Sequence, residues 1–151
     1  MGWTNEHLTQ RCKITNAITI AEGATASTDV EGAVIDMNGF AGVCAIVLVG
    51  PITTGAATHI NLVQSDVVAM TSPDDLTGTK QTILDTNDNT TFIIDALRPQ
   101  KQFIQLHCDR ATQAATVAAI YIQYGATNLP VTQPTGITGV EVFKDVIAGT
   151  K

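Results

Sequence analysis

The stretch from Gly39 to Asp66 constrains the fold most, because it holds two apolar segments on either side of a strong chain break. Residues 43–49 are continuously apolar, a Gly-Pro dipeptide interrupts them, and residues 58–62 alternate polar and apolar. A continuous β-branched run is typical of a strand covered on both faces, and alternation is typical of a strand with one wet face. The stretch therefore predicts a β-hairpin with a Thr-, Gly- and Ala-rich connection.

Similar short segments recur along the whole chain, separated by turn residues. Strands are expected over residues 13–20, 32–37, 43–49, 58–66, 81–84, 91–95, 101–108 and 116–124. No segment has a convincing helical period, although Ser72–Asp75 suits either one capped helical turn or a loop. About eight short strands with Gly-, Asn-, Asp- and Thr-rich turns predict an all-β fold, an antiparallel β-sandwich or jelly roll.

The chain is expected to form one domain with two polar or irregular ends. Its 151 residues suit a single core. Met1–Arg11 is polar apart from Trp3 and Leu8, which predicts an extended N-terminal arm. Residues 12–130 hold the predicted β-sandwich. Residues 131–151 are rich in Gly and Pro, and predict either a C-terminal tail that lies on a neighbour or a last strand with a frayed end.

Charge and hydropathy narrow the class of partner. The net charge is −6 and the pI is near 4.7, and an acidic surface repels phosphate, so nucleic acid is not an expected partner. Only 15% of residues are charged and Thr is the commonest residue. Such a neutral surface fits contact with other subunits, and equally fits a plain Thr-rich sandwich.

The chain shows no sign of export or of a membrane segment. Residues 1–6 lack a basic stretch followed by an apolar core, and the longest apolar run is far too short to span a bilayer. The three cysteines, Cys12, Cys44 and Cys108, are widely spaced and odd in number. The expectation is a protein made in a reducing cytoplasm, with three buried free thiols and no membrane partner.

No catalytic or metal-binding motif emerges. His107 and Cys108 are adjacent on a predicted strand, so they point to opposite faces and cannot share a metal. Asp85–Asn89 starts like a calcium loop, but Thr90 stands where Gly is needed and Ala96 where Glu is needed, which favours an Asx-rich turn. None of the serines lies in a Gly-x-Ser-x-Gly elbow. The expectation is a protein that is not an enzyme and has no cofactor.

A carbohydrate-binding module or glycosidase stays open as an alternative, because carboxylate pairs assemble in space rather than in sequence. One Trp, two Tyr and four Phe are few for the aromatic platforms that usually bind sugars.

Several short motifs, in a fixed order, carry a resemblance to a known family. They are Asp36–Phe40, the apolar strand after it, Gln64–Asp66, Phe92–Ile94, Arg98–Leu106 and Ala118–Ile122. Over roughly residues 30–125 this order resembles the small β-sandwich structural proteins of tailed bacteriophage heads, the decoration or cement proteins.

The resemblance implies a non-enzymatic virion protein, made in the host bacterial cytoplasm and located on the capsid surface. Its expected partners are the major capsid protein and two further copies of itself, as a homotrimer. A neck or tail structural protein is the alternative within the virion. The expected partner-binding residues are Trp3 and Leu8 in the arm and Val142 and Phe143 in the tail, since Trp and other apolar anchors dominate binding surfaces. For Trp3 the alternative is a covered core edge.

Overall fold

The structure is a computed structural model that describes residues 7–21, 29–52, 54, 58–110 and 115–142. In these residues it contains one helical turn, α1 (Leu8–Arg11), and ten strands. The strands are β1 (Lys13–Ala21), β2 (Val30–Glu31), β3 (Ile35–Asp36), β4 (Gly42–Ile52), β5 (Thr58–Ser65), β6 (Asp74–Asp75), β7 (Gln81–Ile83), β8 (Thr91–Leu97), β9 (Phe103–Asp109) and β10 (Ala115–Tyr124). The helix is far too short to cross a bilayer, and no other helix occurs in the described ranges.

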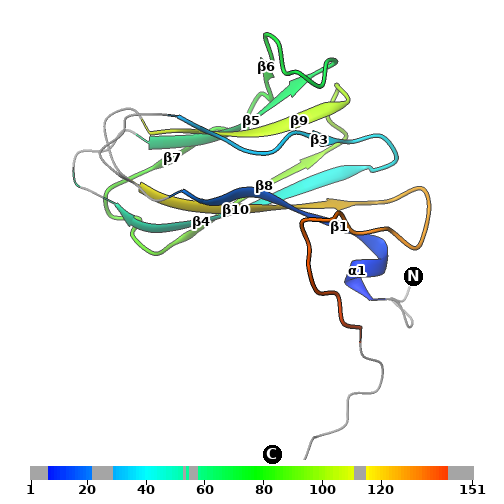
Figure 1. The fold of residues 1–151 in the computed structure, drawn as a ribbon. Coiled ribbons are helices and arrows are strands. Elements are labelled where there is room, and N and C mark those ends of the chain that lie inside the picture. Colours follow the sequence, from blue (N-terminus) through cyan, green and yellow to red (C-terminus); the bar gives the residue numbers. More distant parts are fainter. Residues whose placement is uncertain (1–6, 22–28, 53, 55–57, 111–114, 143–151) are drawn as a thin grey trace, which may run out of the picture.

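The strands form two antiparallel sheets packed face to face (Figure 1). Sheet A has the order β1-β10-β4-β8, and sheet B has the order β2-β9-β5-β6, with β3 also on β9 and β7 also on β5. The core lies between the sheets and is almost entirely aliphatic. The predicted all-β sandwich is confirmed.

The pairing order is that of a jelly roll. Because β2 and β3 share the partner β9, and β6 and β7 share β5, each pair behaves as one interrupted strand, which leaves eight strands. The first then pairs with the last, the second with the seventh, the third with the sixth and the fourth with the fifth. The chain is thus one long hairpin rolled up so that β10 also meets β4 and β9 also meets β5, which defines the jelly roll.

The hairpin predicted over Gly39–Asp66 is wrong. Its two arms are real strands, β4 and β5, but β4 lies in sheet A and β5 in sheet B. In the roll each arm finds two partners from distant parts of the chain: β10 and β8 for β4, and β9 and β6/β7 for β5. A strand flanked on both sides satisfies all its backbone groups, which a two-stranded hairpin does not.

The predicted burial of the two arms is also reversed. β4 alternates, with Val43, Ala45 and Val47 in the core, whereas Leu48 on its outer side is 53% exposed. β5 is buried on both sides, because the chain that follows folds back along it, and the Asn61 side chain donates a hydrogen bond to Asp75 at 2.8 Å. The residues on both faces of β4 are apolar, but only one of these faces is buried.

The strand predicted over residues 32–37 is split into β2 and β3 by one buried side chain. Gly32 donates its N–H to the Leu106 carbonyl at 2.7 Å, and Ala33 then turns away to bond Ala17 of sheet A. The Leu106 N–H is left for the Tyr121 hydroxyl, at 2.7 Å. A Cβ at Gly32 would lie 2.7 Å from the Tyr121 hydroxyl oxygen, so this crossing requires glycine.

Two of the predicted turns are confirmed, and a third segment, considered as a helical turn, is a strand. The Asn38-Gly39 turn is confirmed, with Gly39 at a φ of 86° and the Phe40 N–H bonded to the Met37 carbonyl at 3.0 Å. The helical turn considered at Ser72–Asp75 is wrong, because Asp74 and Asp75 form the short strand β6. The Asx-rich turn is confirmed by the Asn87 side chain, which accepts the Leu84 N–H at 2.7 Å.

The cysteine prediction holds for two of three residues. Cys12 and Cys108 are buried free thiols, while Cys44 is only half-buried because it lies on the outer side of β4. Cys108 and His107 do point to opposite faces: Cys108 belongs to the core, and His107 lies on the outer side of β9.

Candidate partner-binding site

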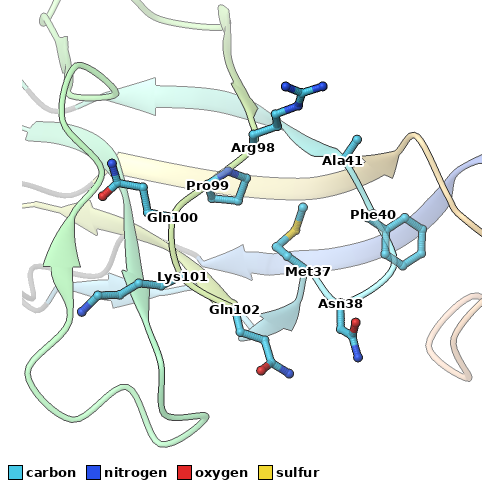
Figure 2. A pocket seen from close by; sticks show the side chains of 9 residues that line it. All are labelled: Met37, Asn38, Phe40, Ala41, Arg98, Pro99, Gln100, Lys101 and Gln102. Atoms are coloured by element: carbon cyan, nitrogen blue, oxygen red, sulfur yellow. The ribbon is translucent and has the colours of Figure 1, made fainter.

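A hollow of about 530 Å³ opens at one end of the sandwich, between the turn that follows β3 and the loop that joins β8 to β9 (Figure 2). Met37 and Pro99 point into it, and Phe40 lies on one wall. Two backbone bonds hold the walls together: Met37 donates to the Gln102 carbonyl, and Arg98 donates to the Ala41 carbonyl, both at 2.8 Å. Backbone hydrogen bonds of the folded domain therefore fix the two walls of the hollow relative to each other.

Arg98 is the most unusual residue at this end. It adopts a φ of 54°, a left-handed conformation that non-glycine residues rarely take and that is often tied to function. Its exposed side chain extends away from the centre of the hollow (Figure 2) and has no ion pair or side-chain hydrogen bond within the described residues. The fold thus exposes the Arg98 guanidinium at the rim of the hollow.

On the other side of Arg98 lies a second hollow, of about 520 Å³, lined by Asp74, Asp75 and Asp95 among others. Lys101 lies close by and is fully engaged, with its ammonium 2.6 Å from Asp74 and 3.7 Å from Asp66. The hydrogen bond to Asp74 raises the pKa of Lys101. Around Arg98, the described residues therefore include an acidic group of three aspartates and a lysine that is neutralised by two carboxylates.

Two smaller hollows continue the depression towards the N-terminal helix. One of about 270 Å³ shares Asn38 and Phe40 with the first hollow, and one of about 330 Å³ lies between Pro130 and Gln10 of α1. The shared lining residues join all four hollows into one broken groove across the loop end of the sandwich. Such a groove has the shape of an extended binding surface rather than of an enclosed small-molecule pocket.

The two terminal segments meet at this end, and Gln133 joins them. Its amide nitrogen donates to the carbonyls of Thr9 and Cys12, each at 2.7 Å, and its amide oxygen accepts the Ile14 N–H at 2.9 Å. Val131 adds a backbone bond to the Gln10 carbonyl at 2.8 Å. One side chain therefore fixes both α1 and the start of the C-terminal segment to the edge strand β1.

The expected binding residues are only partly described. Leu8, on α1, is 49% exposed, and Val142, in a segment without helix or strand, is 44% exposed. Trp3 and Phe143 lie outside the described residues. The structure brings the segments around Leu8 and Gln133 together, and sequence analysis missed both Gln133 and Arg98. The only sequence signal at Arg98 was the following proline, which normally favours extended backbone rather than positive φ.

The outer face of sheet B is polar and contains two histidines. His59 lies 3.5 Å from Asp109, and His107 lies 4.0 Å from Glu31. Gln105 contacts His107 at 3.2 Å. In the described part of the chain, no three His, Cys, Asp or Glu side chains are placed to hold a metal ion.

The described aromatic side chains offer little to a sugar ring. Phe40, Phe92, Phe103 and Tyr124 are half-buried and Tyr121 is buried. Within the described residues there is thus no exposed aromatic platform for the carbohydrate alternative.

No protein-family model matches the sequence, and no curated protein matches it. Among solved structures, the fold is similar to that of the PBSX exported protein XepA, with a TM-score of 0.53 and 11% sequence identity. The match covers 93% of this chain and 46% of the XepA chain, so this chain spans slightly under half of that protein's length. At this identity the likeness shows a shared fold.

Proposed function

We propose that this chain is a structural protein of a bacteriophage particle, and that it binds the outer surface of the capsid as a decoration, or cement, protein. The observation that carries the proposal is the fold shared over 93% of the chain with XepA, which belongs to the phage PBSX. Jelly rolls also build viral capsid proteins, lectins and cupins, so the fold agrees with a virion role without specifying it.

Surface chemistry supports a role in protein contact. Leu8, Val140 and Val142 expose apolar side chains in the two terminal segments. Few charges stand on the surface, and interfaces that pack flat are depleted in charged groups at their centre. A protein that binds the assembled shell but not its free subunits stabilises the shell by mass action, and three linked copies on one capsid axis raise the avidity further.

The proposed partners are therefore the major capsid protein and further copies of this chain, and catalysis is no part of the role. The direct test is to mix the purified chain with capsids that lack it, and to measure co-sedimentation, the oligomeric state by light scattering, and the copy number by electron microscopy. On the order of hundreds of copies per particle is expected, whereas about six or twelve would indicate a neck or tail component instead. A monomer that does not bind capsids contradicts the proposal.

The contribution of the arm is testable with two truncations. Deletion of residues 1–6 removes Trp3 but leaves α1, whereas deletion of residues 1–11 also removes the helix that Gln133 holds. We expect both variants to melt close to the full chain and to bind capsids more weakly. A large fall in melting temperature for the shorter deletion would show that the arm belongs to the core instead.

A further inference from the structure

The outer face of sheet A is apolar across three neighbouring strands. The register places Ile120 of β10 beside Ile46 of β4, and Ile46 beside Ile93 of β8, so three isoleucines form one row. Their strand neighbours Val47, Ile94 and Ala119 belong to the core, so this row points outward. Leu48, Ile93 and Leu97 are 53%, 56% and 64% exposed. Contiguous exposed apolar surface of this kind marks an interaction site.

The face also contains a shallow hollow of about 220 Å³. It is lined by Leu48, Ala118 and Ile120, together with Asn16 and Thr19 of β1. The register pairs Leu48 with Ala118, so a large side chain stands directly beside a small one. The face thus combines a ridge with a recess, as packed interfaces do.

Charge is almost absent from this face. Among the described outward residues of β4, β8 and β10, only Asp95 is charged at neutral pH, and it accepts a hydrogen bond from the Tyr124 hydroxyl at 2.6 Å. Burial and then Asp95 raise the pKa of Tyr124 to about 12, so the hydroxyl keeps its proton. A charged partner would lose hydration here without gaining a counter-charge, so the face is complementary to an uncharged apolar surface.

Sheet B shows the opposite character, which gives the molecule two unlike sides. Its outer face carries His59, Asn61, Gln105, His107 and Asp109, most of them joined to polar neighbours. Polar side chains thus occupy the outer side of sheet B, and the buried ones among them, Asn61 and Gln105, donate hydrogen bonds to Asp75 and to the Gly32 carbonyl. The apolar face of sheet A is therefore the side that needs a partner.

The position of the two terminal segments helps to identify the partner of this face. α1 and residues 131–142 project beyond sheet A, on the side away from sheet B (Figure 1). They are fixed to β1, as the bond from the Asn16 side chain to the Gly136 carbonyl also shows. Leu8, Val140 and Val142, the exposed apolar side chains that the proposed function assigns to protein contact, belong to these segments. The segments and the apolar face of sheet A thus form one continuous side of the molecule, which fits a surface as broad as that of a capsid shell.

We propose that the outer face of sheet A docks the domain onto an uncharged, apolar surface of a capsid shell subunit. The inference rests on the proposed function, and it assigns to the shell contact a sheet face in addition to the chain ends.

The test uses the full chain and capsids that lack it. Ile93→Glu and Leu48→Glu place a charge on the apolar face at exposed positions, and Thr82→Glu places the same charge at an exposed position of β7 in sheet B. We expect each of the first two variants to bind capsids at least about tenfold more weakly and Thr82→Glu to bind like the wild type. Melting curves of all three verify that the variants are folded.

A second measurement needs no substitution, because Cys44 lies on the same face, half-buried, while Cys12 and Cys108 are buried. Alkylation of Cys44, followed by mass spectrometry, should slow by about tenfold or more in the capsid-bound protein.

The outcomes separate the two proposals. Wild-type protein that fails to bind capsids overturns the proposed function. Wild-type protein that binds, together with unchanged binding of the Glu variants or unchanged alkylation of Cys44, overturns the docking face alone. A wild-type dimer that Ile93→Glu dissociates, with capsid binding intact, assigns the face to a second copy and also overturns the docking face.

Discussion

The hydroxyl of Tyr121, on sheet A, accepts a hydrogen bond from the backbone N–H of Leu106, on sheet B, at 2.7 Å. Both residues are fully buried. The bond replaces a ladder bond at the place where β2 and β3 separate, and it links the two sheets through the core. The Tyr121 hydroxyl is thus a buried polar group in a core that is mostly aliphatic.

Tyr121→Phe should therefore destabilise the fold. The substitution leaves the Leu106 N–H buried without a partner, which costs about 1–3 kcal/mol of unfolding free energy. For a chain of this size we expect the melting temperature to fall by roughly 2–4 °C for each kcal/mol. Tyr124→Phe is the matched control, since its hydroxyl bonds Asp95 at the surface, and calorimetry should show a smaller loss. Equal losses in the two variants would contradict the role assigned to Tyr121.

Gln133→Ala should release α1 from β1 while the sandwich stays folded. It removes the bonds to the Thr9 and Cys12 carbonyls and exposes the Ile14 N–H. Hydrogen exchange over residues 8–14 should accelerate by about tenfold or more, which corresponds to the loss of one or two net hydrogen bonds.

Gln133→Glu sharpens this experiment, because it keeps the acceptor for Ile14 but cannot donate to the carbonyls. It should free residues 8–12 and leave the Ile14 amide protected. Gln102→Ala, which removes an exposed bond to Asp36, serves as the control. Unchanged exchange at residues 8–12 in both Gln133 variants would show that packing, and not this side chain, holds the helix.

The buried thiol of Cys108 is expected to make the folded protein less stable at high pH. Burial raises the pKa of the Cys108 thiol from 9.0 to about 11 in the folded protein. Its contribution is fully present below the unfolded pKa, and it is lost as the pH rises from about 9 to about 11, because only the unfolded chain then ionises. The free energy of unfolding should decrease by up to about 3 kcal/mol over this window.

Cys108→Ala isolates that contribution, since Tyr121 also has a raised pKa from burial and adds its own loss at higher pH. Denaturant unfolding at several pH values should show a flatter decline between pH 9 and 11 in the variant than in the wild type. Parallel declines would contradict the assignment to this thiol.

Lys101→Met should loosen the segment 66–75 without unfolding the domain. The lysine pairs with Asp74 and Asp66, whose side chains are largely exposed, so the effect on global stability is small. Limited proteolysis should cut this segment faster, and more so than in Lys80→Met, which changes an exposed lysine on the neighbouring turn. Equal cutting of the two variants would show that Lys101 does not restrain it.

Local patterns predicted most of the strands but not how they assemble. The alternation over residues 116–124 and the Asn38-Gly39 turn depend on neighbours in sequence, and both are confirmed. The split of residues 32–37 was not predictable, because it depends on Tyr121, which is remote in sequence. The groove at the loop end was missed for the same reason: it depends on the backbone of Arg98 and on contacts of Gln133 with α1.

The sequence by itself determined that this chain forms a β-sandwich of short strands, because side-chain period and turn chemistry are local properties. Tertiary structure alone decided that β4 and β5 part into different sheets, since backbone pairing selects partners across the whole chain. It also decided which apolar face is covered. The run over residues 43–49 is apolar on both sides, yet only the side that meets sheet B is buried, which leaves the other side of sheet A exposed.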